Sequence, residues 1–163
     1  MKNLIIPLVI MMTLIAFSGC IQSDTSNING LSSNINDDLK NGDNNYNNAV
    51  KDLNSYSYSS ASTDCNNALS NFNSAKALAT QGLSYAQNSK DNILIQYMQL
   101  TISEIDSRVN ATLELQQAIS YLQKNNTIEG NQHATSANNF MTSSMNFKKQ
   151  QEDLVNQNPS KFK

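Results

Sequence analysis

Proline and arginine are scarce in this chain of 163 residues, and their scarcity has structural consequences. The two prolines are Pro7 and Pro159, so the long stretch between them contains none. Because a proline inside a helix removes a backbone donor and clashes with the preceding turn, this stretch is free to form long helices. The single arginine is Arg108, and no basic run exceeds the pair Lys148-Lys149. The positive surface that nucleic-acid phosphates require is therefore missing, and we expect no nucleic-acid partner.

Histidine and cysteine are too few for the usual metal and haem centres. Di-iron bundles need carboxylates on four helices and histidines on two of them, in Glu-x-x-His pairs. Here His133 is the sole histidine, and Glu129 lies four residues before it. The only thiols are those of Cys20 and Cys65, which are too few for a zinc site. We expect no metal and no cofactor, a solvated or hydrogen-bonded His133, and a Cys65 that packs as a small hydrophobe in the core.

Acidic side chains lack the arrangement that catalysis requires. No histidine or lysine is spaced to form a catalytic dyad with any of them, and no glycine-rich phosphate loop is present. Glu104 and Arg108, four residues apart, predict an ion pair on a helix surface. The sequence therefore predicts a protein that is not an enzyme. We expect the acids to be solvated at Asp37, Asp38, Asp43, Asp52, Glu104, Asp106 and Glu114.

Uncharged polar residues take the place of charged ones. Asparagine, serine, glutamine and threonine make up 68 of the 163 residues, whereas charged residues are only 15%, below the usual quarter. A disordered chain of this composition would lack regularly spaced apolar residues. Here they recur throughout, so we expect one folded domain with one core.

Apolar residues recur at steps of three and four in four successive segments of similar length, which is the spacing of one helix face. The first segment keeps this phase through Asn41-Gly42-Asp43-Asn44-Asn45, so we expect a weak point inside one helix there. Small residues dominate the second segment, which would let a neighbouring helix approach closely. The residues are Ile28, Leu31, Ile35, Leu39, Tyr46, Ala49, Val50, Leu53 and Tyr56 in the first; Ala61, Cys65, Ala68, Phe72, Ala75, Ala79, Gly82 and Ala86 in the second; Leu94, Met98, Ile102, Ile105, Val109, Leu113, Ile119 and Leu122 in the third; and Ile128, Ala134, Ala137, Met141, Met145, Leu154 and Val155 in the fourth.

Polar strings separate these segments and set the predicted fold. They predict breaks at residues 57–60, 88–92 and 124–127, and an end at Asn158-Pro159. Asn126 with Glu129 predicts a capping box at the start of the last helix. Four helices of near-equal length with short connections predict an all-α fold, an antiparallel up-down-up-down four-helix bundle with coiled-coil-like packing. Because the first break contains neither glycine nor proline, three long helices remain an alternative.

The N-terminus has the parts of a secretory signal. A basic Lys2 is followed by a non-ionic run over residues 4–17, too short for the roughly 20 residues that cross a bilayer as a helix. Two small residues then precede Cys20. The string Phe17-Ser18-Gly19-Cys20 resembles the lipobox of prokaryotic membrane lipoproteins, with Phe17 where leucine is usual. This resemblance covers the first twenty residues. It implies cleavage before Cys20 and attachment of a lipid, such as one that carries palmitate, to its thiol; an ordinary signal peptide and an uncleaved signal anchor are the alternatives.

The resemblance implies a division of the chain and a location. The expected parts are a signal peptide at 1–19, a lipidated tether at 20–27, a helical bundle domain at 28–158 and a tail at 159–163. The lipid on Cys20 would hold the protein on the extracytoplasmic side of the cell membrane and would prevent a disulfide with Cys65. The abundance of asparagine, isoleucine and tyrosine indicates an A+T-rich genome, bacterial or archaeal.

Two Asn-x-Thr sequons begin at Asn110 and Asn125, and both are candidate glycosylation sites of an exported chain. Asparagine, serine and threonine are so abundant here that chance would give more such strings than the two present. The sequons do not by themselves indicate a glycan.

Two functions fit this pattern. The first is a membrane lipoprotein whose helical domain is a structural or protein-interaction module, with the membrane and a protein of the cell envelope as its partners. The second is a small-molecule sensor, similar in outline to the periplasmic four-helix domains of chemoreceptors. A binding cavity between helices would favour the sensor, whereas a filled core with an exposed apolar stripe would favour the interaction module.

Overall fold

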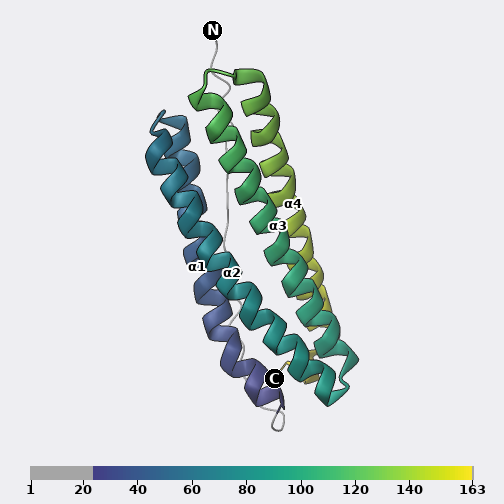
Figure 1. Ribbon diagram of the computed structural model, residues 1–163. Helices are drawn as coiled ribbons and strands as arrows, with labels where there is room; N and C mark the ends of the chain where they lie inside the picture. The colour runs from purple at the N-terminus through teal and green to yellow at the C-terminus, as the bar shows by residue number, and fades with distance from the viewer. Residues whose placement is uncertain (1–23, 163) are drawn as a thin grey trace.

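The computed structural model describes residues 24–162, which form four long helices and a short 3-10 turn (Figure 1). Successive helices run antiparallel, so the expected all-α, up-down-up-down four-helix bundle is confirmed. The alternative of three long helices is wrong. The elements are α1 (Asp24–Asn54), α2 (Tyr58–Ser89), α3 (Asn92–Gln123), α4 (Thr127–Gln157) and η1 (Pro159–Lys161).

Two helix starts differ from the expected ones. Helix α1 begins at Asp24, so the described part of the expected tether is helical. The first break lies at residues 55–57, and Tyr58 already begins α2, whereas the sequence pattern placed the break at 57–60. The polar string at residues 41–45 stays inside α1, as expected.

The predicted capping box at Asn126 is wrong. Its side chain makes no capping hydrogen bond. The backbone N–H of Asn126 still donates to the carbonyl of Tyr121 at the end of α3 (3.0 Å). Its φ and ψ are −90° and 82°, and this ψ is smaller than that of the extended conformation that a capping residue usually has. The capping side chain with the expected geometry belongs instead to Asp91, whose carboxylate accepts from the N–H groups of Ile93 (3.0 Å) and Leu94 (3.3 Å) at the start of α3.

Each of the three helix connections contains one non-glycine residue with a positive φ. These residues are Tyr56 (60°), Lys90 (56°) and Asn125 (60°). Glycine is the usual residue in this left-handed conformation, because a Cβ is disfavoured there. The connections therefore carry little of the glycine signal by which turns are recognised in a sequence.

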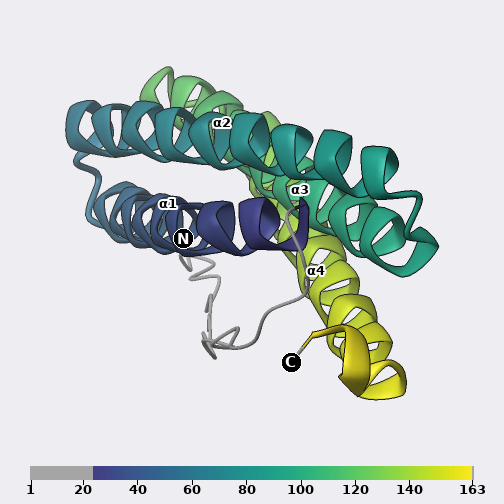
Figure 2. The ribbon, with the colours of Figure 1, turned by 90° about the horizontal axis from the view of Figure 1, so that it is seen from below.

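The four helices pack as two hairpins. Helix α1 lies along α2, α3 lies along α4, and α2 joins the hairpins by packing against α3. Figure 2 shows the α1–α2 hairpin lying across the α3–α4 hairpin. Helix α1 touches α3 at few positions, and α1 and α4 do not pack along one another. The bundle is therefore closed on three sides and much less so between α1 and α4.

The small-residue face of α2 lies in the core, as the spacing predicts. All eight residues of that series are buried: Ala61, Cys65, Ala68, Phe72, Ala75, Ala79, Gly82 and Ala86. Phe72 is the large member, and its ring lies so close to Gly42 of α1 that a Cβ on Gly42 would overlap it. The polar string expected to be a weak point of α1 thus contains a close contact between α1 and α2.

The C-terminal residues also pack on the bundle. The Lys161 ammonium lies 2.6 Å from the Asp91 carboxylate, and the rings of Phe162 and Tyr97 have centroids 5.2 Å apart. Burial alone would raise the pKa of Asp91, but the hydrogen bonds from Lys161 and from the backbone at the start of α3 hold it below its ordinary value. As far as Phe162, the expected tail is therefore attached to α3.

Among residues 24–162, no helix is long and apolar enough to span a membrane.

Candidate functional site: a buried charge network

The charged side chains predicted to lie on the surface include three that are buried. Arg108 and Glu104 on α3 and Asp43 on α1 are 7%, 4% and 1% exposed. The expected surface ion pair between Glu104 and Arg108 exists, with Nη1 and Oε1 2.6 Å apart, but it lies inside the bundle. The expectation that Asp43 and Glu104 are solvated is wrong for the same reason.

Arg108 is the centre of this network, which joins three helices. Its Nε donates to Asp43 Oδ1 on α1 (3.0 Å), and its Nη1 donates to Glu104 Oε1 on α3 and to Ser144 Oγ on α4, both at 2.6 Å. The amide of Gln151 on α4 donates to the other oxygen of Glu104 (2.6 Å). We call these five residues the Arg108 network.

Burial changes the protonation properties of the network. It raises the pKa of Asp43 above the ordinary 3.8. The Arg108 guanidinium and, to a smaller extent, the Lys148 ammonium lower this pKa, but they do not cancel the rise. Burial disfavours the charged form of Arg108, but the two carboxylates more than offset it and raise its pKa. Arg108 therefore stays cationic, and Asp43 accepts a proton more readily than an exposed aspartate does.

The network presents no unpaired buried polar atom to a ligand. Every buried side-chain nitrogen and oxygen within residues 27–162 has a hydrogen-bond partner. The network also contains no histidine, thiol or hydroxyl beside a free base, so it offers no nucleophile for covalent catalysis. The hydrogen bonds and ion pairs of the network hold α1, α3 and α4 in place relative to one another.

The sequence analysis did not predict the network, although its members on α3 and α4 continue the regular spacing of the apolar residues on those helices. Arg108 lies in the strict four-three alternation of α3 formed by Leu94, Met98, Thr101, Ile105, Arg108, Thr112, Leu115 and Ile119. The same alternation on α4 runs from Ala137 and Met141 into Ser144, Lys148 and Gln151. A polar residue that continues an apolar phase on two helices is the signal that could have revealed a buried polar cluster.

His133 is held by a residue that its sequence neighbours do not indicate. Its Nδ1 lies 2.7 Å from Glu114 Oε2 on α3, and its ring stacks on Tyr121 with centroids 5.2 Å apart. Both members of the His133–Glu114 pair are about one third exposed. No group of three or more potential metal ligands occurs in the described part of the chain. The arrangement attaches the start of α4 to α3.

Cys65 has the properties of a core residue, as expected. It is a free and fully buried cysteine on α2. Burial, together with the nearby Asp64 carboxylate, raises the pKa of the thiol to about 12. A thiol with this pKa is almost wholly protonated at neutral pH and is a poor nucleophile.

The two sequons lie in different surroundings. Asn110 is exposed in the middle of α3, but Thr112 of its sequon is fully buried and its hydroxyl donates to the carbonyl of Arg108 (2.8 Å). Asn125 is exposed in the connection between α3 and α4. A glycan needs an accessible surface segment, and of the two candidates Asn125 meets this condition. Cys20, the predicted lipidation site, lies outside the described residues.

Comparison of the chain with protein-family models, with curated proteins and with solved structures gave no match.

Proposed function

We propose that this protein is a lipid-anchored protein of the cell envelope, and that its helical bundle is a structural or protein-interaction module on the extracytoplasmic side of the membrane. The observation that carries the anchor is the lipobox-like string Phe17-Ser18-Gly19-Cys20 behind a short apolar run. Such a run can direct export and place the cysteine thiol where a lipid is attached.

The bundle supports a non-catalytic role in this proposal. The buried polar atoms of the Arg108 network have hydrogen-bond partners inside the bundle, and the buried Cys65 thiol is protonated at neutral pH. These features stabilise a fold and provide no reacting group. They also give the small-molecule sensor less support, since the polar groups between the helices already have partners.

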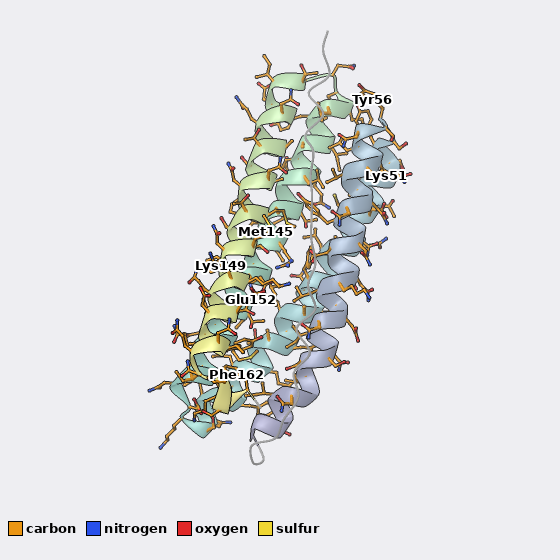
Figure 3. All side chains as sticks on the ribbon, turned by 180° about the vertical axis from the view of Figure 1, so that it is seen from behind. Lys51, Tyr56, Met145, Lys149, Glu152 and Phe162 are labelled. Carbon is orange, nitrogen blue, oxygen red and sulfur yellow. The ribbon has the colours of Figure 1, made fainter. Side chains whose placement is uncertain are left out.

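The exposed apolar residues are scattered over the described surface. Tyr56, Leu113, Ile128 and Met145 are the large ones, and Figure 3 shows Tyr56 at one end of the bundle and Met145 midway along α4. They come from the first connection, from α3 and from α4, so they do not point to one particular binding face for the proposed partner.

An anchor at Cys20 would fix the orientation of the bundle. Helix α1 begins at Asp24, and its 31 residues span about 45 Å at 1.5 Å per residue. The start of α1 would then lie close to the membrane. The α1–α2 and α3–α4 connections lie together at the opposite end (Figure 1) and would project away from it.

Mass spectrometry of the mature protein from membranes tests the anchor. We expect a chain that starts at residue 20 and carries a diacylglyceryl group, and Cys20→Ala should abolish membrane retention or block processing. Cys65→Ala is the matched control, because it removes the other thiol and should leave lipidation unchanged. An unlipidated mature N-terminus would refute the anchor.

Crosslinking in intact envelopes tests the interaction role. The wild-type protein should give a defined crosslinked species with an envelope protein, and Cys20→Ala, if exported without its anchor, should give less of it. A wild-type protein that crosslinks to nothing would remove the support for an interaction module and would leave the anchor untouched.

A further inference from the structure

The side of the bundle between α1 and α4 has much less helix-to-helix packing than the other three sides. The helix pairs α1–α2, α2–α3 and α3–α4 have extensive packing, whereas α1 and α4 do not pack along one another. Figure 3 is drawn from the side on which α1 and α4 lie in front of α2 and α3. The α1–α2 hairpin is therefore attached to the other hairpin mainly through α2.

The Arg108 network provides a polar contact from α1 to the second hairpin. Asp43 is the residue that α1 contributes, and it receives a hydrogen bond from Arg108 of α3. The same guanidinium group binds Ser144 of α4. The positive charge of Lys148, also on α4, acts on Asp43 as well. Charges from α1 and α4 thus meet around Arg108 on the side where the two helices do not pack along one another.

We infer that the Arg108 network is an electrostatic latch between the two hairpins: Arg108 holds α1 toward α3 and α4, and without its charge the α1–α2 hairpin moves away from α4 while α2 stays packed on α3. The physical reason is the cost of burying two carboxylates. Arg108 compensates Asp43 and Glu104 in the closed form, whereas opening lets water solvate them. The latch is a property of the fold and does not depend on the membrane anchor.

The latch responds to pH in a direction that follows from its surroundings. The titratable and charged groups facing Asp43 are Tyr46 on α1, Glu104 and Arg108 on α3, and Lys148 on α4; Cys65 on α2 faces Tyr46. Burial raises the pKa of Asp43 in the closed form, while hydration in the open form would return it toward its ordinary value. The closed form therefore binds a proton more tightly. Lowering the pH favours closing, and raising it favours opening.

Three substitutions separate electrostatics from shape. Arg108→Met keeps a long side chain but leaves two buried carboxylates uncompensated, so it should open the latch. Asp43→Asn mimics the protonated residue and should keep it closed at every pH. The triple variant Asp43→Asn, Glu104→Gln, Arg108→Met has no charge to compensate, and it should close again if charge rather than side-chain shape opens Arg108→Met.

Electron-spin distance measurements between α1 and α4 test the latch. Spin labels are attached at Asn48→Cys and Gln150→Cys, both exposed positions, in the full chain with Cys20→Ser; the buried Cys65 is left in place. Wild type should gain a longer-distance population as the pH rises from about 4 to about 9. That population should be several times larger in Arg108→Met, absent in Asp43→Asn and largely lost again in the triple variant.

A second label pair distinguishes opening from unfolding. Labels at Ser70→Cys on α2 and Asn110→Cys on α3, also exposed, should report one unchanged distance in all variants. The latch is refuted if the α1–α4 distances are the same in wild type and all variants at every pH. It is equally refuted if the α2–α3 distance lengthens together with the α1–α4 distance, because the hairpins would then separate as a whole. If Arg108→Met does not fold, wild type across the pH range and Asp43→Asn still decide the question.

Discussion

The small-residue face of α2, called its apolar seam below, and the Arg108 network are both buried, but they stabilise the bundle in different ways. The seam consists of small side chains, with Phe72 as its one large member opposite Gly42. Its contribution depends on how much apolar surface is buried and how well the volume is filled. The network depends on a balance of charges, so removing the cation leaves the buried carboxylates uncompensated. A change in the seam should therefore have a graded cost that depends on volume, whereas a change in the network should depend on which charge is removed.

Arg108→Met should produce the largest loss of stability. It leaves the carboxylates of Asp43 and Glu104 buried without their cation, and breaking a buried pair from one side costs about 3–5 kcal/mol. The measurement is the free energy of unfolding from chemical denaturation.

The matched control for Arg108→Met is Lys76→Met. Lys76 pairs with Asp106 at 2.6 Å, but both side chains are 43% exposed. Its loss should cost less than about 1 kcal/mol, because water screens an exposed pair. Similar costs for the two substitutions would show that burial of the network contributes little.

Ala75→Leu and Ala79→Leu should have the next largest effects. Both alanines are fully buried in the seam of α2, and overpacking a filled core costs about 1–3 kcal/mol. Ala77→Leu is the control on the same helix, since Ala77 is exposed and leucine is nearly as good a helix former as alanine. Thermal unfolding of the three variants is the measurement. A seam that accepts leucine without loss would contradict its close packing.

Asp43→Asn should have a smaller effect that depends on pH. The amide can still accept from Arg108, so at neutral pH we expect the free energy of unfolding to stay within about 1 kcal/mol of wild type. The pKa of Asp43 is higher in the folded state than the ordinary 3.8 of the unfolded chain, so the folded state binds the proton more tightly. The contribution of Asp43 to stability therefore rises as the pH falls through its folded pKa and is complete below the unfolded pKa.

The difference in unfolding free energy between Asp43→Asn and wild type isolates this contribution. Other carboxyl groups, such as Asp91 with its lowered pKa, contribute less to the stability of the protein as the pH falls. Their contributions are the same in wild type and variant and therefore cancel in the difference. Wild type should gain relative to the variant as the pH falls. A constant difference, or one of the opposite sign, would contradict the raised pKa of Asp43.

His133→Ala should have the smallest effect, about 1 kcal/mol or less, because its pair with Glu114 is partly exposed. A double-mutant cycle with Glu114→Gln measures the coupling between the two residues, which we expect to be favourable. The same cycle with Glu129→Gln should give no coupling, since Glu129 is the neighbour in sequence and Glu114 is the partner in the fold. Coupling to Glu129 alone would reverse this assignment.

The helices could be predicted from the sequence because helix formation depends on local spacing. Apolar steps of three and four residues identified four helices, and the buried face of α2 was predicted residue by residue. The start of α2 was displaced by a few residues, since the first connection uses a positive φ at Tyr56 where no glycine marks a turn. The start of α1 at Asp24 also lies a few residues before the expected one.

The candidate site was less predictable because its members come from distant parts of the chain. Asp43 and Arg108 are 65 residues apart, and a charged residue on a helix is usually solvated. Only the assembly of the four helices into a bundle excludes water from both. The four-three phase of Arg108 was present in the sequence, but a phase gives the face of a helix and does not name the partners on other helices.

The sequence by itself therefore determined the helical class and the small-residue face of α2, because both follow from the regular geometry of a single helix. It favoured four helices but left three open. The tertiary structure decided which charges are buried, which carboxylate holds His133 and which two neighbouring helices do not pack along one another. These depend on how far each helix lies from the others, and on the desolvation that results where they meet.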